Sequence, residues 1–177
     1  SCMFSIHYFF KSEETLDTYL MNVSSLLRTN GTFFCTFMDG KRIEDEINSN
    51  GGDMIEGVKN TEIDIKNRVP IWAIIRRFNK DTKDKYNKKI DVFIESTSKF
   101  IPEYLVSYEE LVEKCKTFNL ELVESELFSE YFNKIKSAIP DDDAEKENIH
   151  KIVMELDKDL VQKKFSFFNR WCIFKKV

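Results

Sequence analysis

Hydrophobic residues are densest at the start of the chain, in residues 1–10. Six of these ten residues are Met, Ile, Phe or Tyr, and the run is too short for a helix that has no capping residue. We predict a buried strand over residues 1–8 that presents His7 and Tyr8 at its carboxyl end. In open α/β sheets that edge is where ligands bind. A core strand whose aromatic rings only pack is the alternative interpretation.

The next fifty residues continue an alternation of strand and helix. Ser12 is a suitable N-cap for a helix with apolar residues at helical spacing from Leu16 to Leu27, and Asn30-Gly31 provides its stop. Residues 32–38 are β-branched and aromatic, which predicts a second buried strand. Strand, helix and strand at this spacing predict a right-handed βαβ unit with a parallel pair. A short helix through Ile43 and a loop over residues 48–53 follow.

The middle of the chain is less regular. Residues 69–78 and 89–95 read as strands, and the lysine-rich residues 79–88 between them as a loop, either solvated or facing RNA. Pro102-Glu103 is predicted to begin a segment that enters a helix capped by Ser107.

The last third returns to clear periodicity. Residues 120–124 alternate apolar and charged side chains, as a half-exposed strand does. Residues 129–138 predict a helix, Pro140 and the acidic residues 141–143 a new helix start, and the following helix runs through Leu160. We expect residues 167–175 to form a last strand, antiparallel to residues 120–126 at the edge of the sheet. The fold class is therefore α/β with a mixed sheet, and residues 1–177 form a single domain.

Composition narrows the classes of function. The formal net charge of −4 leaves no global cationic field for nucleic acid, so any RNA contact must be local. The four cysteines lie in apolar surroundings without a close pair, which favours free thiols in a reducing, intracellular compartment. No apolar run approaches the length of a membrane span. Because residue 1 lies within an apolar stretch and is not Met, we interpret the chain as a piece of a longer protein.

Several kinds of site find no support in the sequence. His7 and His150 are far apart and no cysteine pair has ligand spacing, so no metal site is predicted. No Ser/His/Asp or Cys/His signature is present, and the five glycines form no phosphate-binding loop. The acidic run 141–143 is explained by the dipole of the helix that it precedes.

Three segments occur in the order and at the distances of one known family. Residues 4–10 (FSIHYFF), 36–40 (TFMDG) and 101–106 (IPEYLV) together resemble the mRNA cap guanine-N7 methyltransferases, and the Met-Asp-Gly piece is most similar to the capping enzymes of large DNA viruses. The resemblance covers nearly the whole chain but only the second half of such a methyltransferase domain. It implies a class I, Rossmann-like fold and methyl transfer from S-adenosylmethionine to N7 of the 5′ guanosine cap.

The resemblance also implies partners. The glycine-rich loop that binds the methyl donor is absent here and is expected upstream, so the isolated chain is expected to be inactive. The expected partners are 5′-capped RNA and the remainder of the capping enzyme, with a stimulatory subunit left open. The compartment is then the host cytoplasm or the virion for a viral protein, and the nucleus for a cellular one. The rival hypothesis is a catalytically inactive methyltransferase-like module that serves as an interaction or allosteric subunit.

Four residues match the family's best-defined positions. Phe4, His7 and Tyr8 match the Phe-x-x-His-Tyr element between the methyl donor and the guanine, and Glu103 matches the glutamate that holds the guanine edge. A carboxylate can accept hydrogen bonds from guanine N1–H and N2–H₂, while a His7 ring N–H can donate to O6. Without the resemblance, Glu103 reads as a surface carboxylate before a helix.

The remaining positions are less closely matched. A stacking aromatic is expected for the guanine, with Tyr86 as first choice and Phe93 as alternative. Met3 stands where cellular members carry Gln beside the donor. The donor contacts that the resemblance implies are Met3, Phe4 and Tyr8, and Tyr8 is also predicted to contact the cap guanine. Phe168-Asn169 stands where they carry Tyr, and Phe168 is predicted to retain the stacking contact without the hydroxyl.

Overall fold

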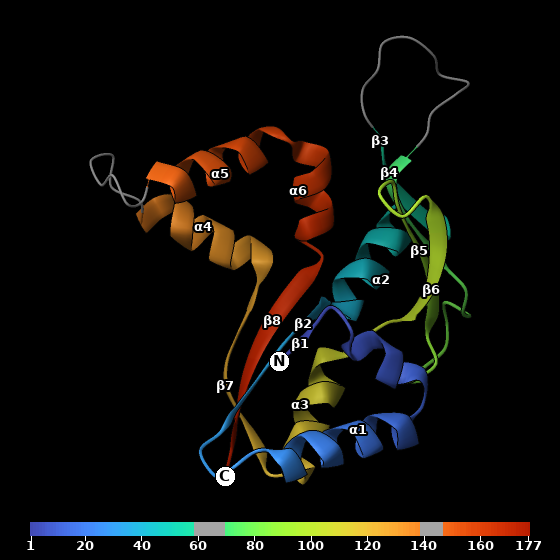
Figure 1. The fold of residues 1–177 in the computed structure, drawn as a ribbon. Coiled ribbons are helices and arrows are strands. Elements are labelled where there is room, and N and C mark those ends of the chain that lie inside the picture. The colour runs from blue at the N-terminus through green and yellow to red at the C-terminus, as the bar shows by residue number, and fades with distance from the viewer. Residues whose placement is uncertain (59–69, 139–146) are drawn as a thin grey trace.

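Two four-stranded sheets make up the framework of the protein (Figure 1). The computed structural model describes residues 1–58, 70–138 and 147–177. The strand order is β1-β2-β8-β7 in the first sheet and β3-β4-β5-β6 in the second. Residues 59–69 and 139–146 lie outside the described residues, and so does the helix start that was predicted at Pro140 and the acidic run 141–143.

The first sheet is mixed, as predicted. Its strands are β1 (Cys2–Met3), β2 (Thr32–Met38), β8 (Asn169–Lys176) and β7 (Leu120–Leu127). The parallel pairing of β1 with β2 and the antiparallel pairing of β7 with β8 at the edge are both confirmed. Helices α1 (Glu13–Leu26) and α3 (Tyr108–Thr117) cover one face of this sheet, where a continuous hydrophobic core forms.

The opening segment differs from its prediction. Only Cys2 and Met3 pair as a strand, and residues Ile6–Lys11 form a 3₁₀ helix, η1. Phe4 turns the chain at a φ of 50°, where its backbone N–H donates to the Thr36 carbonyl at 3.0 Å. The tight helical turn buries Ile6, His7 and Phe10 together, whereas an alternating strand would have placed His7 and Phe10 on opposite faces. His7 and Tyr8 therefore lie on η1 and not at the tip of a strand.

The second sheet is entirely antiparallel and was only partly predicted. It contains β3 (Met54–Val58), β4 (Pro70–Arg76), β5 (Lys89–Ile94) and β6 (Lys99–Tyr104). No strand was predicted over β3, and Pro102-Glu103 lies within β6 instead of beginning a segment toward a helix. Pro102 is tolerated because β6 is an edge strand of its sheet, where a missing N–H need not break a ladder bond. Helix α2 (Gly40–Ser49) buries Ile43 and Ile47 against the inner face.

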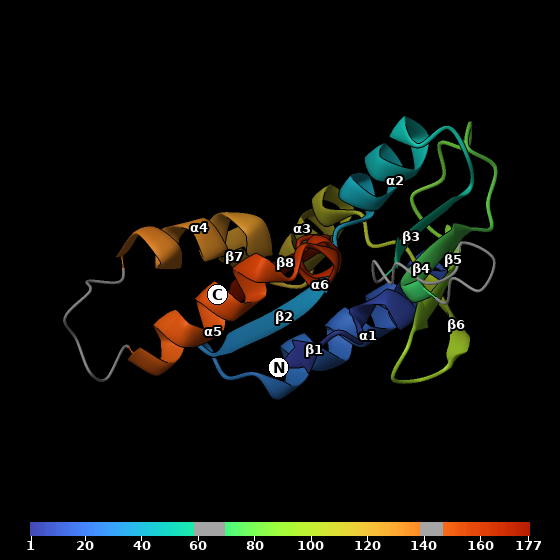
Figure 2. The same ribbon diagram turned by 90° about the horizontal axis from the view of Figure 1, so that it is seen from above.

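Three helices connect β7 to its neighbour β8 in the first sheet and extend away from the sheet as an arm (Figures 1 and 2). This helical arm consists of α4 (Phe128–Ala138), α5 (Glu147–Lys158) and α6 (Leu160–Ser166). The single helix predicted through Leu160 is in fact two, since Asp159 ends α5 and caps α6 by accepting from the Gln162 N–H at 3.0 Å. The arm is tied to the second sheet by Trp72, whose indole N–H donates to the Val161 carbonyl at 2.8 Å.

Two further sequence-based expectations concern the chain as a whole. All four cysteines are free and buried, as expected for thiols in apolar surroundings. Among the described residues, no helix combines the length and apolar character needed to cross a membrane.

Candidate functional site

A cavity of about 710 Å³ lies where η1, both sheets and the helical arm meet. We call it the central cavity. Its walls come from segments that are distant in sequence, and most of its surface is apolar. The lining residues are Phe4, His7, Met38, Ile71, Trp72, Ile94, Glu95, Ser96, Glu103, Phe128, Leu156, Gln162, Phe165, Ser166 and Asn169.

His7 and Glu103 form the polar centre of this cavity. On β6, Glu103 is paired with buried Ile90, so its side chain shares the inner, core-facing side of the second sheet. On η1, His7 is buried by the same helical turn that buries Ile6 and Phe10. The His7 Nδ1 atom lies 3.6 Å from Glu103 Oε2, and the two side chains are 10% and 15% exposed. The two polar residues predicted to face the guanine are therefore brought together.

Burial shifts the pKa of both groups toward their neutral forms. It lowers the pKa of His7 from 6.5 to about 4 and raises the pKa of Glu103 from 4.5 to about 7. Desolvation disfavours a charged imidazolium and a charged carboxylate alike, which explains the opposite directions. Near neutral pH the imidazole is therefore uncharged, and the carboxyl group is poised between its two forms.

The ring of His7 has one nitrogen to spare. A neutral imidazole carries a single N–H, so one ring nitrogen donates and the other accepts. Nδ1 faces Glu103, whereas Nε2 is buried and has no hydrogen-bond partner among the described residues. A buried polar atom without a partner costs free energy unless a ligand or water meets it. Nε2 is thus available to a polar ligand in the central cavity.

Of the three predicted donor-side residues, Phe4 alone lines the central cavity. Phe4 lines it directly and is 48% exposed, while Met3 is 51% exposed and lines a neighbouring cavity. Tyr8 lies on the solvent side of η1 with its ring centroid 4.1 Å from that of His7, and it does not line the central cavity.

The three predicted stacking residues lie elsewhere. The Tyr86 hydroxyl donates to Glu110 Oε1 at 2.6 Å. Burial, together with this bond, raises the pKa of Tyr86. Phe93 pairs with Phe100 on the outer face of the second sheet, the face opposite Glu103, with ring centroids 5.3 Å apart. Phe168 is buried against Trp72 at 5.7 Å. None of the three lines the central cavity, so the structure does not bring them together with Glu103.

Other aromatic rings provide the walls that were expected from those residues. Phe4, Trp72, Phe128 and Phe165 all line the central cavity, and Trp72 contacts Phe165 with ring centroids 5.4 Å apart. Trp72, Phe128 and Phe165 were missed because each comes from a different element whose position depends on tertiary packing. A tryptophan within a predicted strand was the strongest available indication.

The lysine-rich loop supports the framework. Lys88 Nζ lies 2.9 Å from Glu44 Oε1, and Lys85 forms an ion pair with Glu110. These two lysines therefore already have acidic partners within the chain, as in the interpretation of this segment as an ordinary loop.

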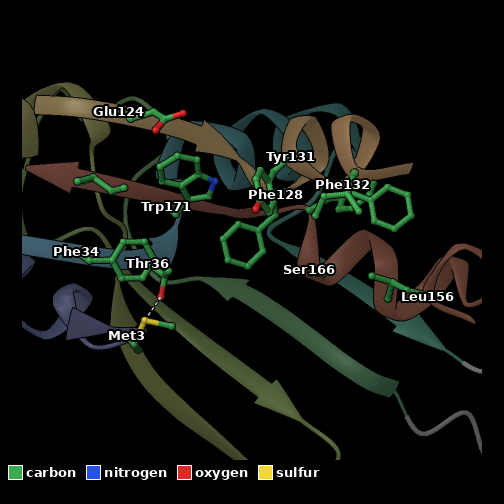
Figure 3. A pocket seen from close by; sticks show the side chains of 13 residues that line it. Met3, Phe34, Thr36, Glu124, Phe128, Tyr131, Phe132, Leu156, Ser166 and Trp171 are labelled. Carbon is green, nitrogen blue, oxygen red and sulfur yellow. Dashed lines mark hydrogen bonds between the residues drawn. The ribbon is translucent and has the colours of Figure 1, made fainter. Parts of the chain in front are cut away.

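A second cavity of about 610 Å³ adjoins the central one (Figure 3). It lies over the face of the first sheet opposite α1 and α3, between Met3, Phe34 and Trp171 on the sheet and α4 of the arm. Phe128, Leu156 and Ser166 line both cavities, so these residues of the arm form a shared wall between them. The second cavity is strongly apolar.

Known proteins match this chain over most of its length. The family described as the mRNA (guanine-N(7))-methyltransferase domain matches residues 1–165. An mRNA cap guanine-N(7) methyltransferase of Meyerozyma guilliermondii is 31% identical over 140 residues, which are 76% of this chain and 23% of that protein. A probable mRNA-capping enzyme of Acanthamoeba polyphaga mimivirus is 30% identical over 145 residues, 77% of this chain and 12% of that protein. A solved S-adenosylmethionine-dependent methyltransferase from Clostridium acetobutylicum has a TM-score of 0.49 at 12% identity, covering 99% of this chain and 56% of that one. The chain thus spans less than a quarter of the length of these two sequence relatives.

Proposed function

We propose that this chain, which belongs to the mRNA (guanine-N(7))-methyltransferase family, forms the guanine-binding part of a protein that methylates N7 of the 5′ cap. The family expected from the three sequence segments is thereby confirmed, and its relatives include both a fungal methyltransferase and a viral capping enzyme. The observation that carries the proposal is the buried His7–Glu103 pair in an aromatic-walled cavity.

The chemistry of the cavity suits a guanine base. When ionised, Glu103 presents two acceptor oxygens to the adjacent N1–H and N2–H₂ donors of guanine. With guanine bound there, a proton on His7 Nε2 can be donated to O6. The rings of Phe4, Trp72, Phe128 and Phe165 offer apolar contact to the base, and stacking on such a ring contributes about 1–3 kcal/mol. The cavity of about 710 Å³ has room for a nucleoside and part of its linkage.

Methyl transfer to N7 needs positioning more than proton transfer. N7 of a 5′-linked guanine carries a free lone pair, which forms the new N–C bond while the C–S bond of the donor breaks and its electrons remain on sulfur. S-adenosylmethionine supplies the electrophilic methyl carbon in this step. His7 and Glu103 hold the Watson–Crick edge of the base and thereby aim N7, which is a contribution of orientation and not of acid–base catalysis.

The residues at the end of β1 fit a contact with the methyl donor. Met3 and Phe4 are half-exposed apolar side chains at that strand end, and Phe4 lines the cavity assigned to the base. The chain covers under a quarter of each of these relatives, and, as the family resemblance implies, the part of the protein that holds most of the donor is proposed to lie upstream. Capped RNA and the remainder of a capping enzyme are the proposed partners.

The experiment is a methyl-transfer assay with the full-length protein. Radiolabelled S-adenosylmethionine is incubated with GpppA-capped RNA, and the product is digested to the cap dinucleotide and separated. The proposal predicts label in 7-methyl-GpppA. Binding of capped RNA without any transfer would instead support the rival hypothesis of an inactive methyltransferase-like module.

A further inference from the structure

Asn169 is a further polar residue that lines the central cavity, beside His7 and Glu103, and it is buried. It is the first residue of β8, opposite Met38 of β2, and it is 5% exposed. Its side chain lines the same cavity as His7 and Glu103. Its position at the junction of α6 with the first sheet places a fixed amide at the boundary of the cavity.

The orientation of this amide is determined by α6. The Nδ2 group donates to the carbonyls of Ser166 at 3.0 Å and Phe165 at 3.4 Å, at the end of α6. Carbonyls can only accept hydrogen bonds, so the amino group must face them and Oδ1 must point away. That Oδ1 atom is buried and has no hydrogen-bond partner in the part of the chain that the structure describes.

Among the described residues, two that line the central cavity therefore each carry a buried side-chain atom without a hydrogen-bond partner, Asn169 Oδ1 and His7 Nε2. A buried acceptor without a partner destabilises the protein when no ligand is bound, and a ligand group that donates a hydrogen bond to it removes this cost. Oδ1 has no proton to give, so the ligand group that it takes must be an N–H or O–H donor.

Resting on the proposed function, we infer that Asn169 Oδ1 accepts the second N–H of the guanine 2-amino group. The Watson–Crick edge of guanine offers three N–H donors, one on N1 and two on N2, and one acceptor, O6. The Glu103 carboxylate can accept hydrogen bonds from N1–H and from one N2–H, and a proton on His7 Nε2 can be donated to O6. The remaining N2–H needs an acceptor, and Asn169 supplies it. Asn169 is then a residue that distinguishes guanine from bases without a 2-amino group.

The test compares two caps that differ only in this group. The full-length protein is assayed for N7 methylation on guanosine-capped and inosine-capped RNA, since inosine lacks the 2-amino group. The measured quantity is the ratio of kcat/KM for guanosine to kcat/KM for inosine. Because both substrates meet the same folded fraction of enzyme, the ratio is insensitive to loss of stability.

Asn169→Leu keeps the size of the side chain and removes both the Oδ1 acceptor and the Nδ2 group that donates to the carbonyls of α6. We expect the guanosine-to-inosine ratio to fall by about tenfold, the effect of one buried hydrogen bond. The matched control is Asn48→Leu, which removes an amide that accepts from Arg76 Nη1 at 2.7 Å, outside the lining of the cavity, and should leave the ratio unchanged.

Three results would overturn the inference. They are an unchanged ratio in Asn169→Leu, an equal fall in Asn48→Leu, or a fall that appears only between guanosine caps with and without a ribose hydroxyl. The last result would assign Oδ1 to the sugar. Failure of the proposed function is distinguishable, because the unsubstituted protein would then methylate neither cap.

Discussion

Replacing Glu103 by Gln tests the assignment of the guanine pocket. The substitution keeps the size of the side chain but replaces one acceptor oxygen with an amino group that faces the N–H groups of the base. A hydrogen bond to a charged group contributes about 1.5–3 kcal/mol, and an unpaired buried partner costs a similar amount. At about 1.4 kcal/mol per factor of ten, kcat/KM for capped RNA should fall by roughly one to two orders of magnitude.

The pH dependence of the same reaction provides a second measurement. Because burial raises the pKa of Glu103 to about 7, only part of the protein carries the ionised carboxylate at neutral pH. The kcat/KM of the unsubstituted protein should therefore rise with pH through about 7 and then level off. Glu103→Gln should lack this rise.

The assay needs a control with the same chemical change. Glu56 lies on β3 of the same sheet, exposed on the face opposite Glu103, so Glu56→Gln should leave kcat/KM unchanged. The affinity for S-adenosylmethionine and the melting temperature should change little in either variant. A folded Glu103→Gln protein that methylates capped RNA at the normal rate would show that Glu103 is a structural carboxylate.

Three further predictions follow from the contacts described above. In Glu103→Gln, His7 still has a pKa of about 4, below its ordinary 6.5. Between about pH 4 and 6.5 the native state therefore binds fewer protons than the unfolded chain, and the free energy of unfolding should rise with pH. In His7→Gln, the raised pKa of Glu103 should make the free energy of unfolding fall with pH between 4.5 and about 7. Each slope should reach up to about 1.4 kcal/mol per pH unit. Urea unfolding that shows slopes of the same sign in the two variants would refute this. Gly57→Ala should destabilise the protein by about 1–3 kcal/mol, because the new Cβ would lie 2.3 Å from Trp72 Nε1, and normal stability in urea would contradict the packing. Tyr86→Phe should lower stability by about 1–3 kcal/mol through its lost bond to a buried carboxylate yet leave methyl transfer intact, whereas a selective loss of activity would return Tyr86 to the guanine site.

The sequence predicted the elements whose periodicity is local and strong. The alternation in residues 120–124 and the β-branched run 32–38 led to the correct pairings of β7 with β8 and of β1 with β2. The opening stretch failed because a dense apolar run suits a strand and a 3₁₀ turn equally, and the choice depends on which side chains the core can bury together.

Two strands of the second sheet were not predicted because each contains a residue that usually disfavours a strand. Strand β3 contains Gly57, which reads as a strand breaker, but the structure needs a glycine there because Trp72 occupies the space of a side chain. Strand β6 contains Pro102, which is tolerated only because the strand lies at an edge. Neither fact can be read from the local sequence.

The polar part of the candidate site was predictable and its aromatic part was not. His7 and Glu103 were expected to face one ligand, and the structure places them 3.6 Å apart. The choice of Tyr86 or Phe93 depended on strand register and loop packing, and a one-residue change in register moves a side chain to the other face of a sheet. Phe93 lies on the outer face because side chains along a strand alternate between the two faces of the sheet.

The most direct measurement is a structure of the full-length protein with GpppA and S-adenosylhomocysteine bound. We expect the guanine ring in the central cavity, with N1 and N2 within hydrogen-bond distance of the Glu103 carboxylate and N7 directed toward the sulfur of S-adenosylhomocysteine. A guanine bound outside this cavity, or one whose N1 and N2 face away from Glu103, would contradict it.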